Sequence, residues 1–105
     1  MIGSEDICKA VQLLREAANP RRVILFGSYA TGNADEQSDI DLLVVEDRVT
    51  DVAGEIVRLL RVLSPLRIPA DVLVVNATDF EAWSDTPGNV MFEAVNFGKV
   101  LYEAA

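Results

Sequence analysis

The stretch RVILFGSYATGNADEQSDIDLLVV, residues 22–45, decides the fold of this chain. It holds two apolar runs rich in aliphatic and β-branched side chains, which favour strands. The residues between the runs are mostly polar and include Gly27 and Gly32, as expected for a loop. The pattern predicts one strand over 22–26, a polar loop that includes 33–38, and a second strand from Ser38 to Val45.

Two carboxylates, Asp39 and Asp41, stand at the start of the second predicted strand. Residues two apart on a strand point to the same face, so these carboxylates would lie about 6.5–7 Å apart. Left bare, they would repel by roughly 2–3 kcal/mol at an effective dielectric near 20. A divalent cation such as Mg²⁺ or Mn²⁺, which prefers hard oxygen ligands, would convert this repulsion into attraction. We therefore interpret them as candidate metal ligands, with a solvated strand end capped by Ser38 as the alternative.

A Gly-Ser pair, Gly27-Ser28, follows the first predicted strand directly. Glycine permits a tight turn and the close approach of a phosphate or of another backbone. Ser28 adds a hydroxyl, and the residues after it can open a helical turn whose free N–H groups face an anion. The pair is a candidate phosphate-binding turn, although an ordinary surface turn would have the same composition.

The composition predicts a single small domain over residues 1–105. The formal charge of −8 speaks against a nucleic-acid groove or an anionic membrane surface, and fits a basic protein partner or a bound divalent cation. No histidine is present, which excludes His-based acid–base catalysis, and the single cysteine excludes an intrachain disulfide. No apolar run reaches the ~18 residues of a membrane span and no targeting segment is recognisable, so we expect a cytoplasmic protein.

The remaining segments read as alternating helices and strands. Predicted elements are a helix from a Ser4 cap to a stop at Asn19-Pro20, a helix from Thr50-Asp51 to Ser64-Pro65, a strand over 70–76, a short helix over Thr78–Trp83, a helix from Thr86-Pro87 to Gly98, and a strand over 99–102.

The order of these elements predicts an α/β (α+β) fold with a mixed sheet. Gly27 and Asp39 meet only if the first two strands run antiparallel or the loop between them doubles back. The strand–helix–strand unit that follows should be a parallel crossover, which places Asp71 at the same end of the sheet as Asp39. We expect three to four strands with helices packed mainly on one face.

The chain resembles the minimal nucleotidyltransferases (MNT) of the DNA polymerase beta superfamily. Their signature is an apolar strand, Gly-Ser, about ten residues, and Asp-x-Asp opening a second strand. The matching residues in this sequence are Gly27, Ser28, Asp39 and Asp41. The family places a third carboxylate on a later strand, where this chain has Asp71. One position departs from the pattern, because Thr31 stands where many relatives carry arginine.

The resemblance implies that Asp39, Asp41 and Asp71 are catalytic and bind two Mg²⁺ ions, with Mn²⁺ as a substitute. It implies that Gly27 and Ser28 contact the phosphates of a nucleoside triphosphate, ATP in an adenylyltransferase.

The resemblance also implies a partner. Minimal members resemble the antitoxin of an MNT/HEPN toxin–antitoxin pair, which adenylylates a tyrosine of a helical HEPN ribonuclease. The alternative is a catalytically degenerate nucleotidyltransferase fold that neutralises its partner by contact, which Thr31 favours and the acidic triad disfavours. Either form could be a homodimer or a hetero-oligomer, with no direct contact to nucleic acid or membrane.

Overall fold

The computed structural model describes residues 2–105, so residue 1 of the expected domain lies outside the described residues. The elements in chain order are α1 (Ser4–Ala18), β1 (Arg22–Phe26), α2 (Ser28–Thr31), β2 (Ile40–Glu46), α3 (Val52–Leu63), the 3₁₀ turn η1 (Ser64–Leu66), β3 (Ala70–Asn76), α4 (Ala77–Trp83), α5 (Val90–Phe97) and β4 (Lys99–Glu103).

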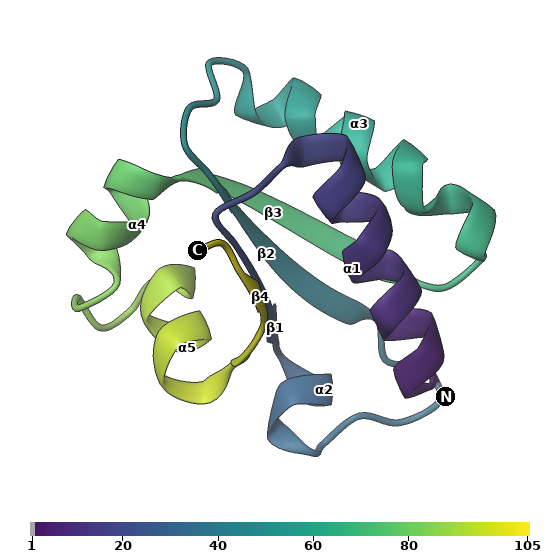
Figure 1. Cartoon of the computed structure of the whole chain (residues 1–105). Coiled ribbons are helices and arrows are strands. Elements are labelled where there is room, and N and C mark those ends of the chain that lie inside the picture. Colours follow the sequence, from purple (N-terminus) through teal and green to yellow (C-terminus); the bar gives the residue numbers. More distant parts are fainter. Residues whose placement is uncertain (1) are drawn as a thin grey trace.

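The four strands form one mixed sheet in the order β3-β2-β1-β4 (Figure 1). β1 runs antiparallel to β2 and to β4, whereas β2 and β3 are parallel. The mixed sheet and the parallel crossover predicted from the sequence are therefore confirmed. β4 is an edge strand, and its pairing with β1 shifts register between Val23 and Ile24. Such an irregularity makes an edge strand less able to pair with another sheet.

Helices cover both faces of the sheet (Figure 1). The two longest, α1 and α3, pack on one face, where Leu14 and Leu59 are fully buried against β-strand residues such as Leu42. The shorter α4 and α5 contribute Phe80 and Ala94 to a second, smaller cluster on the opposite face. The sequence predicted helices mainly on one face; the second cluster arises because β1 and β2 are apolar on both sides.

Several boundaries differ from the sequence prediction, each for a local reason. α1 has Gly3 rather than Ser4 at its N-cap, without a side-chain cap bond. β2 begins at Ile40 rather than Ser38, because the Ser38 hydroxyl accepts the Asp35 N–H at 3.0 Å and closes a turn. Side-chain bonds to nearby backbone compete in this way with strand pairing.

The last helix, α5, begins three residues later than predicted, at Val90 rather than Pro87. Asn89 is its N-cap and accepts the Phe92 N–H at 3.0 Å. The same side chain donates to the carbonyls of Trp83 and Thr86, which holds the intervening residues as turns. The predicted start of α3 is confirmed, since Asp51 caps it by accepting the Gly54 N–H at 3.0 Å.

None of the helices in the described range 2–105 combines the length and apolar character needed to cross a membrane.

Candidate active site

The predicted site residues come together at one end of the sheet, where β1 ends and β2 and β3 begin. Phe26, Asp41 and Asp71 occupy successive positions across the three strands, since Phe26 pairs with Asp41 and Asp41 with Asp71. Residues directly opposite each other project from the same face of a sheet. Leu43, two residues after Asp41, belongs to the cluster under α4 and α5, so both carboxylates lie on that face. Asp39 is exposed and directly precedes β2.

Gly27 connects β1 to α2 in a conformation that few other residues adopt. Its φ of 73° and ψ of −156° lie in a region that is essentially reserved for glycine. A Cβ placed on Gly27 would also overlap the Asp41 carboxylate, with Oδ2 as the nearest atom. The sequence predicted that a phosphate or the backbone of another molecule could approach this glycine; the group that lies close to it in the structure is the Asp41 side chain. The turn and the carboxylate strand are thus in direct contact.

Helix α2 is a single turn that is held by hydrogen bonds within the turn and by one to the segment before α1. The Gly27 carbonyl accepts the N–H groups of Ala30 and Thr31, at 3.0 and 3.2 Å. The Tyr29 hydroxyl accepts the Ile2 N–H at 3.0 Å and so ties α2 to the segment before α1. The Thr31 hydroxyl lies 3.3 Å from the Gly27 carbonyl oxygen, so Thr31 completes the turn and presents no charge.

The ionisation of Asp41 is disfavoured by its surroundings. The pKa of Asp41 is raised, first by burial and then by the negative charges of Asp71 and Asp39. Hard oxygen donors with unrelieved mutual repulsion suit a divalent cation, whose charge would favour their ionised forms. Asp41 and Asp71, which are paired in register, supply the oxygen donors that Mg²⁺ prefers. Over the described residues 2–105, no three acidic, histidine or cysteine side chains converge as a ready-made metal cage.

One carboxyl group with unusual surroundings was missed by the sequence analysis. Glu46, the last residue of β2, is only 8% exposed. It continues the series Ile40, Leu42 and Val44, whose side chains point to the α1–α3 face. The sequence did contain a signal for this burial. Glu46 continues the two-residue spacing of the buried series, at the end of β2 opposite Asp41.

Comparison with known proteins places the chain in a family. A family model for the nucleotidyltransferase domain matches residues 7–96. The "putative protein adenylyltransferase MJ0141" of Methanocaldococcus jannaschii is 38% identical over 53 residues, which cover 50% of this chain and 52% of that protein. The chain thus spans about half or less of the length of the curated relatives it matches.

Solved structures with the same fold come from toxin–antitoxin complexes. One chain of a toxin–antitoxin crystal structure with AMP-PNP superimposes with a TM-score of 0.67 at 22% identity, covering 98% of this chain and 75% of that one. A chain from the complex of tri-AMPylated Shewanella oneidensis HEPN toxin with MNT antitoxin gives 0.61 at 21% identity, covering 95% and 71%. The resemblance predicted from Gly27-Ser28 and Asp39-x-Asp41 is confirmed, and the chain belongs to the nucleotidyltransferase domain family.

Proposed function

We propose that this chain is a Mg²⁺-dependent nucleotidyltransferase that uses ATP to adenylylate a hydroxyl group of a partner protein. The observation that carries the proposal is the contact of the Gly27 turn with Asp41, which is itself paired in register with Asp71. This arrangement puts a candidate phosphate-binding turn beside two carboxylates on one face of the sheet. The adenylyltransferase name of the archaeal relative supports the choice of ATP.

In the proposed reaction, the acceptor hydroxyl oxygen forms a bond to the α-phosphorus of ATP. The bond from that phosphorus to the oxygen that bridges to the β-phosphate breaks, and pyrophosphate leaves. Asp71 would orient the acceptor hydroxyl and take its proton, while the Gly27 backbone and Ser28 would bind the β- and γ-phosphates. Asp39, Asp41 and Asp71 would hold Mg²⁺, which supplies charge neutralisation at the entering and leaving oxygens.

The proposed partner is a helical toxin of the HEPN class, with this chain as the antitoxin. This choice is supported by the fold that the chain shares with chains of toxin–antitoxin complexes. One of these complexes contains an AMPylated toxin. The formal charge of −8 favours a basic protein surface over nucleic acid or an anionic membrane. We expect this reaction in the cytoplasm, with residues 1–105 acting as one catalytic domain.

A contact-only antitoxin is the second candidate, and one observation favours it. Thr31 closes the α2 turn without a charge, where many relatives carry arginine. In that case the acidic residues would be unnecessary for neutralisation of the partner. A homodimer and a hetero-oligomer are both compatible with either candidate.

The decisive experiment is transfer of radiolabelled AMP from α-labelled ATP to a purified HEPN-class toxin from the same source. The wild type should label the toxin only with Mg²⁺ present, and Asp39→Asn/Asp41→Asn should not. The double variant should also lose Mg²⁺-dependent ATP binding in isothermal titration. Toxin neutralisation that survives in the double variant, with no labelling by the wild type, would establish the contact-only antitoxin instead.

Mg²⁺ alone is expected to raise the melting temperature of the wild type. A ligand that binds only the folded state at 100 times its Kd stabilises that state by about 2.7 kcal/mol. Differential scanning calorimetry over a Mg²⁺ series would measure this shift, and Asp39→Asn/Asp41→Asn should show none. An equal shift in the double variant would place the cation elsewhere on this acidic surface.

A further inference from the structure

Glu46 is a buried carboxyl group at the end of β2 that the proposed reaction does not use. It is the single polar or charged side chain among the buried residues of the described range 2–105, at 8% exposure. Its Oε2 atom is buried and has no hydrogen-bond partner. A buried ionised carboxylate without a full set of partners is strongly unfavourable, whereas a protonated one is tolerated. The position of Glu46 therefore favours a bound proton.

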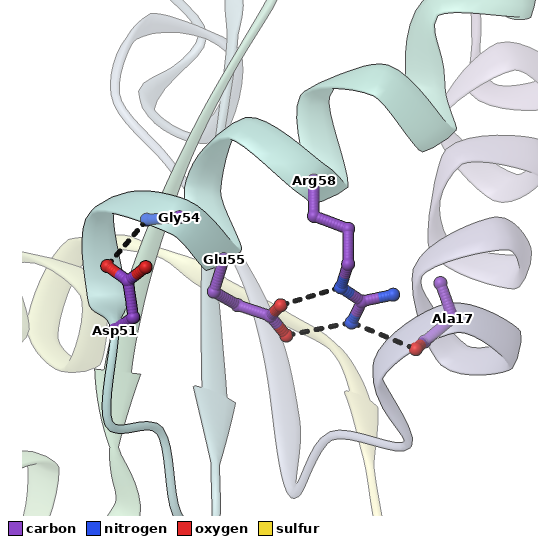
Figure 2. Close-up of polar contacts among 5 residues, drawn as sticks. All are labelled: Ala17, Asp51, Gly54, Glu55 and Arg58. Carbon is purple, nitrogen blue, oxygen red and sulfur yellow. Dashed lines mark hydrogen bonds and ion pairs between the residues drawn. The ribbon is translucent and has the colours of Figure 1, made fainter.

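The neighbour that could share this proton is Glu55, one turn into α3. Glu55 lies four residues before the buried Leu59 and so faces the sheet. Its carboxylate accepts two hydrogen bonds from Arg58, at 2.7 and 2.9 Å, as Figure 2 shows. The same guanidinium donates to the Ala17 carbonyl at the end of α1, at 3.0 Å. Glu55 is thus paired with Arg58, and both residues line one surface cavity with Glu46.

The surroundings shift the pKa values of Glu46 and Glu55 in opposite directions. Burial, and then the hydrogen bond and negative charge of Glu55, raise the pKa of Glu46 to about 7. The hydrogen bond from Arg58 leads the causes that lower the pKa of Glu55. Arg48 and Asp51 complete the charged groups here; they line a surface cavity of about 430 Å³ together with Glu46. Protons can reach Glu46 through this cavity.

We propose that Glu46 and Glu55 hold one proton between them and that this proton is a latch that fastens the first turn of α3 to the end of β2. With the proton present, Glu46 donates to Glu55, and Glu55 anchors Arg58 across to α1. Without it, two carboxylates face each other in a largely buried space, and the start of α3 separates from the sheet. The latch is independent of the proposed transferase activity, because it lies at the opposite end of β2 from Asp41.

The pH dependence follows from the direction of each shift. A raised pKa in the folded state gives stability that is complete below the ordinary value of 4.5 and is lost as the pH rises to about 7. The lowered pKa of Glu55 has the opposite effect. The stability that it contributes is present above pH 4.5 and is lost as the pH falls below that value. Between pH 5.5 and 8.5 the Glu46 shift alone increases the unfolding equilibrium constant roughly 30-fold, with the change levelling off above pH 8.

Urea unfolding at a series of pH values tests the latch, and the absence of histidine removes the side chain that most often titrates in this pH window. Glu46→Gln keeps a neutral donor toward Glu55, so its unfolding constant should change less than about threefold between pH 5.5 and 8.5. Asp47→Asn is the matched control. It removes one charge at the next residue, which is exposed and paired with Arg21, and should keep the full wild-type profile.

Two further measurements locate the effect. Hydrogen exchange should show faster opening of the amides of residues 54 and 55 at pH 8 than at pH 6, after correction for intrinsic exchange, in the wild type only. Direct NMR titration of the Glu46 carboxyl carbon in the wild type should give a midpoint near 7. A midpoint below 5.5, or a Glu46→Gln profile as steep as the wild type, would overturn the latch whatever the outcome of the AMP-transfer assay.

Discussion

An Asp41→Asn variant is expected to lose nucleotidyl transfer by at least about 10²–10³-fold while becoming more stable than the wild type without metal. Asp41 is the central carboxylate of the candidate site, beside Asp71 in register and in contact with the Gly27 turn. Its pKa is raised because burial and the charges of Asp71 and Asp39 disfavour ionisation. Removing that charge relieves the repulsion, by about 1 kcal/mol or less after solvent screening. A site that sacrifices stability for activity behaves in this way.

The AMP-transfer assay and urea unfolding in EDTA would measure the two effects. Glu36→Gln is the matched control, because it removes one charge from the exposed loop between α2 and β2 and should change neither quantity. If Asp41→Asn transferred AMP at the wild-type rate, Asp41 would not be a catalytic residue. A loss of stability in EDTA would show that the carboxylate has a structural partner instead.

A Gly27→Ala variant is expected to lose roughly 2–5 kcal/mol of unfolding free energy. The backbone conformation at this position is strained for any residue with a Cβ, and that Cβ would overlap the Asp41 carboxylate. Asp41 must move or the β1–α2 turn must open, so the molecules that still fold should transfer AMP at least about 10²-fold more slowly. Urea unfolding and AMP transfer under conditions that keep the variant folded would report both losses.

Gly32→Ala is the control for a glycine with positive φ at which an added Cβ would overlap no atom. Gly32 ends α2 in the left-handed conformation, with φ of 82°, but no atom lies within 4 Å of a Cβ placed there. This variant should lose only about 1 kcal/mol and keep its activity. Equal losses in the two variants would mean that the contact between Gly27 and Asp41 has no energetic consequence.

The sequence predicted the parts of the site that depend on local pattern. Two strand ends are indicated by composition alone: one where Gly27-Ser28 follows an apolar run, and one where Asp39-x-Asp41 precedes another. The helix between the second and third strands implies that these two strands are parallel. These features are encoded within a few residues. They predict that Asp41 and Asp71 lie at the same end of the sheet, where the two residues are paired in register.

Features that depend on particular side-chain contacts and on packing were not predictable. The start of α5 is set by Asn89, whose side chain reaches back to Trp83, and Thr86-Pro87 carried the stronger local signal. The overlap of a Gly27 side chain with Asp41 depends on strand register. The burial of Glu46 depends on how α3 packs, because its position in the strand alone is equally compatible with an exposed end.

The order of strands also affects how the chain acquires its structure during synthesis. β1 lies between β2 and β4, but β4 is formed by residues 99–103, at the far end of the described chain. Translation adds about 5–20 residues per second, so roughly 4–15 seconds pass between the synthesis of β1 and that of β4. During that interval its apolar residues and unpaired backbone groups face the crowded surroundings of the ribosome, where strand edges promote aggregation. Pairing with β4 therefore covers a strand edge of β1 that stays open while the residues between the two strands are translated.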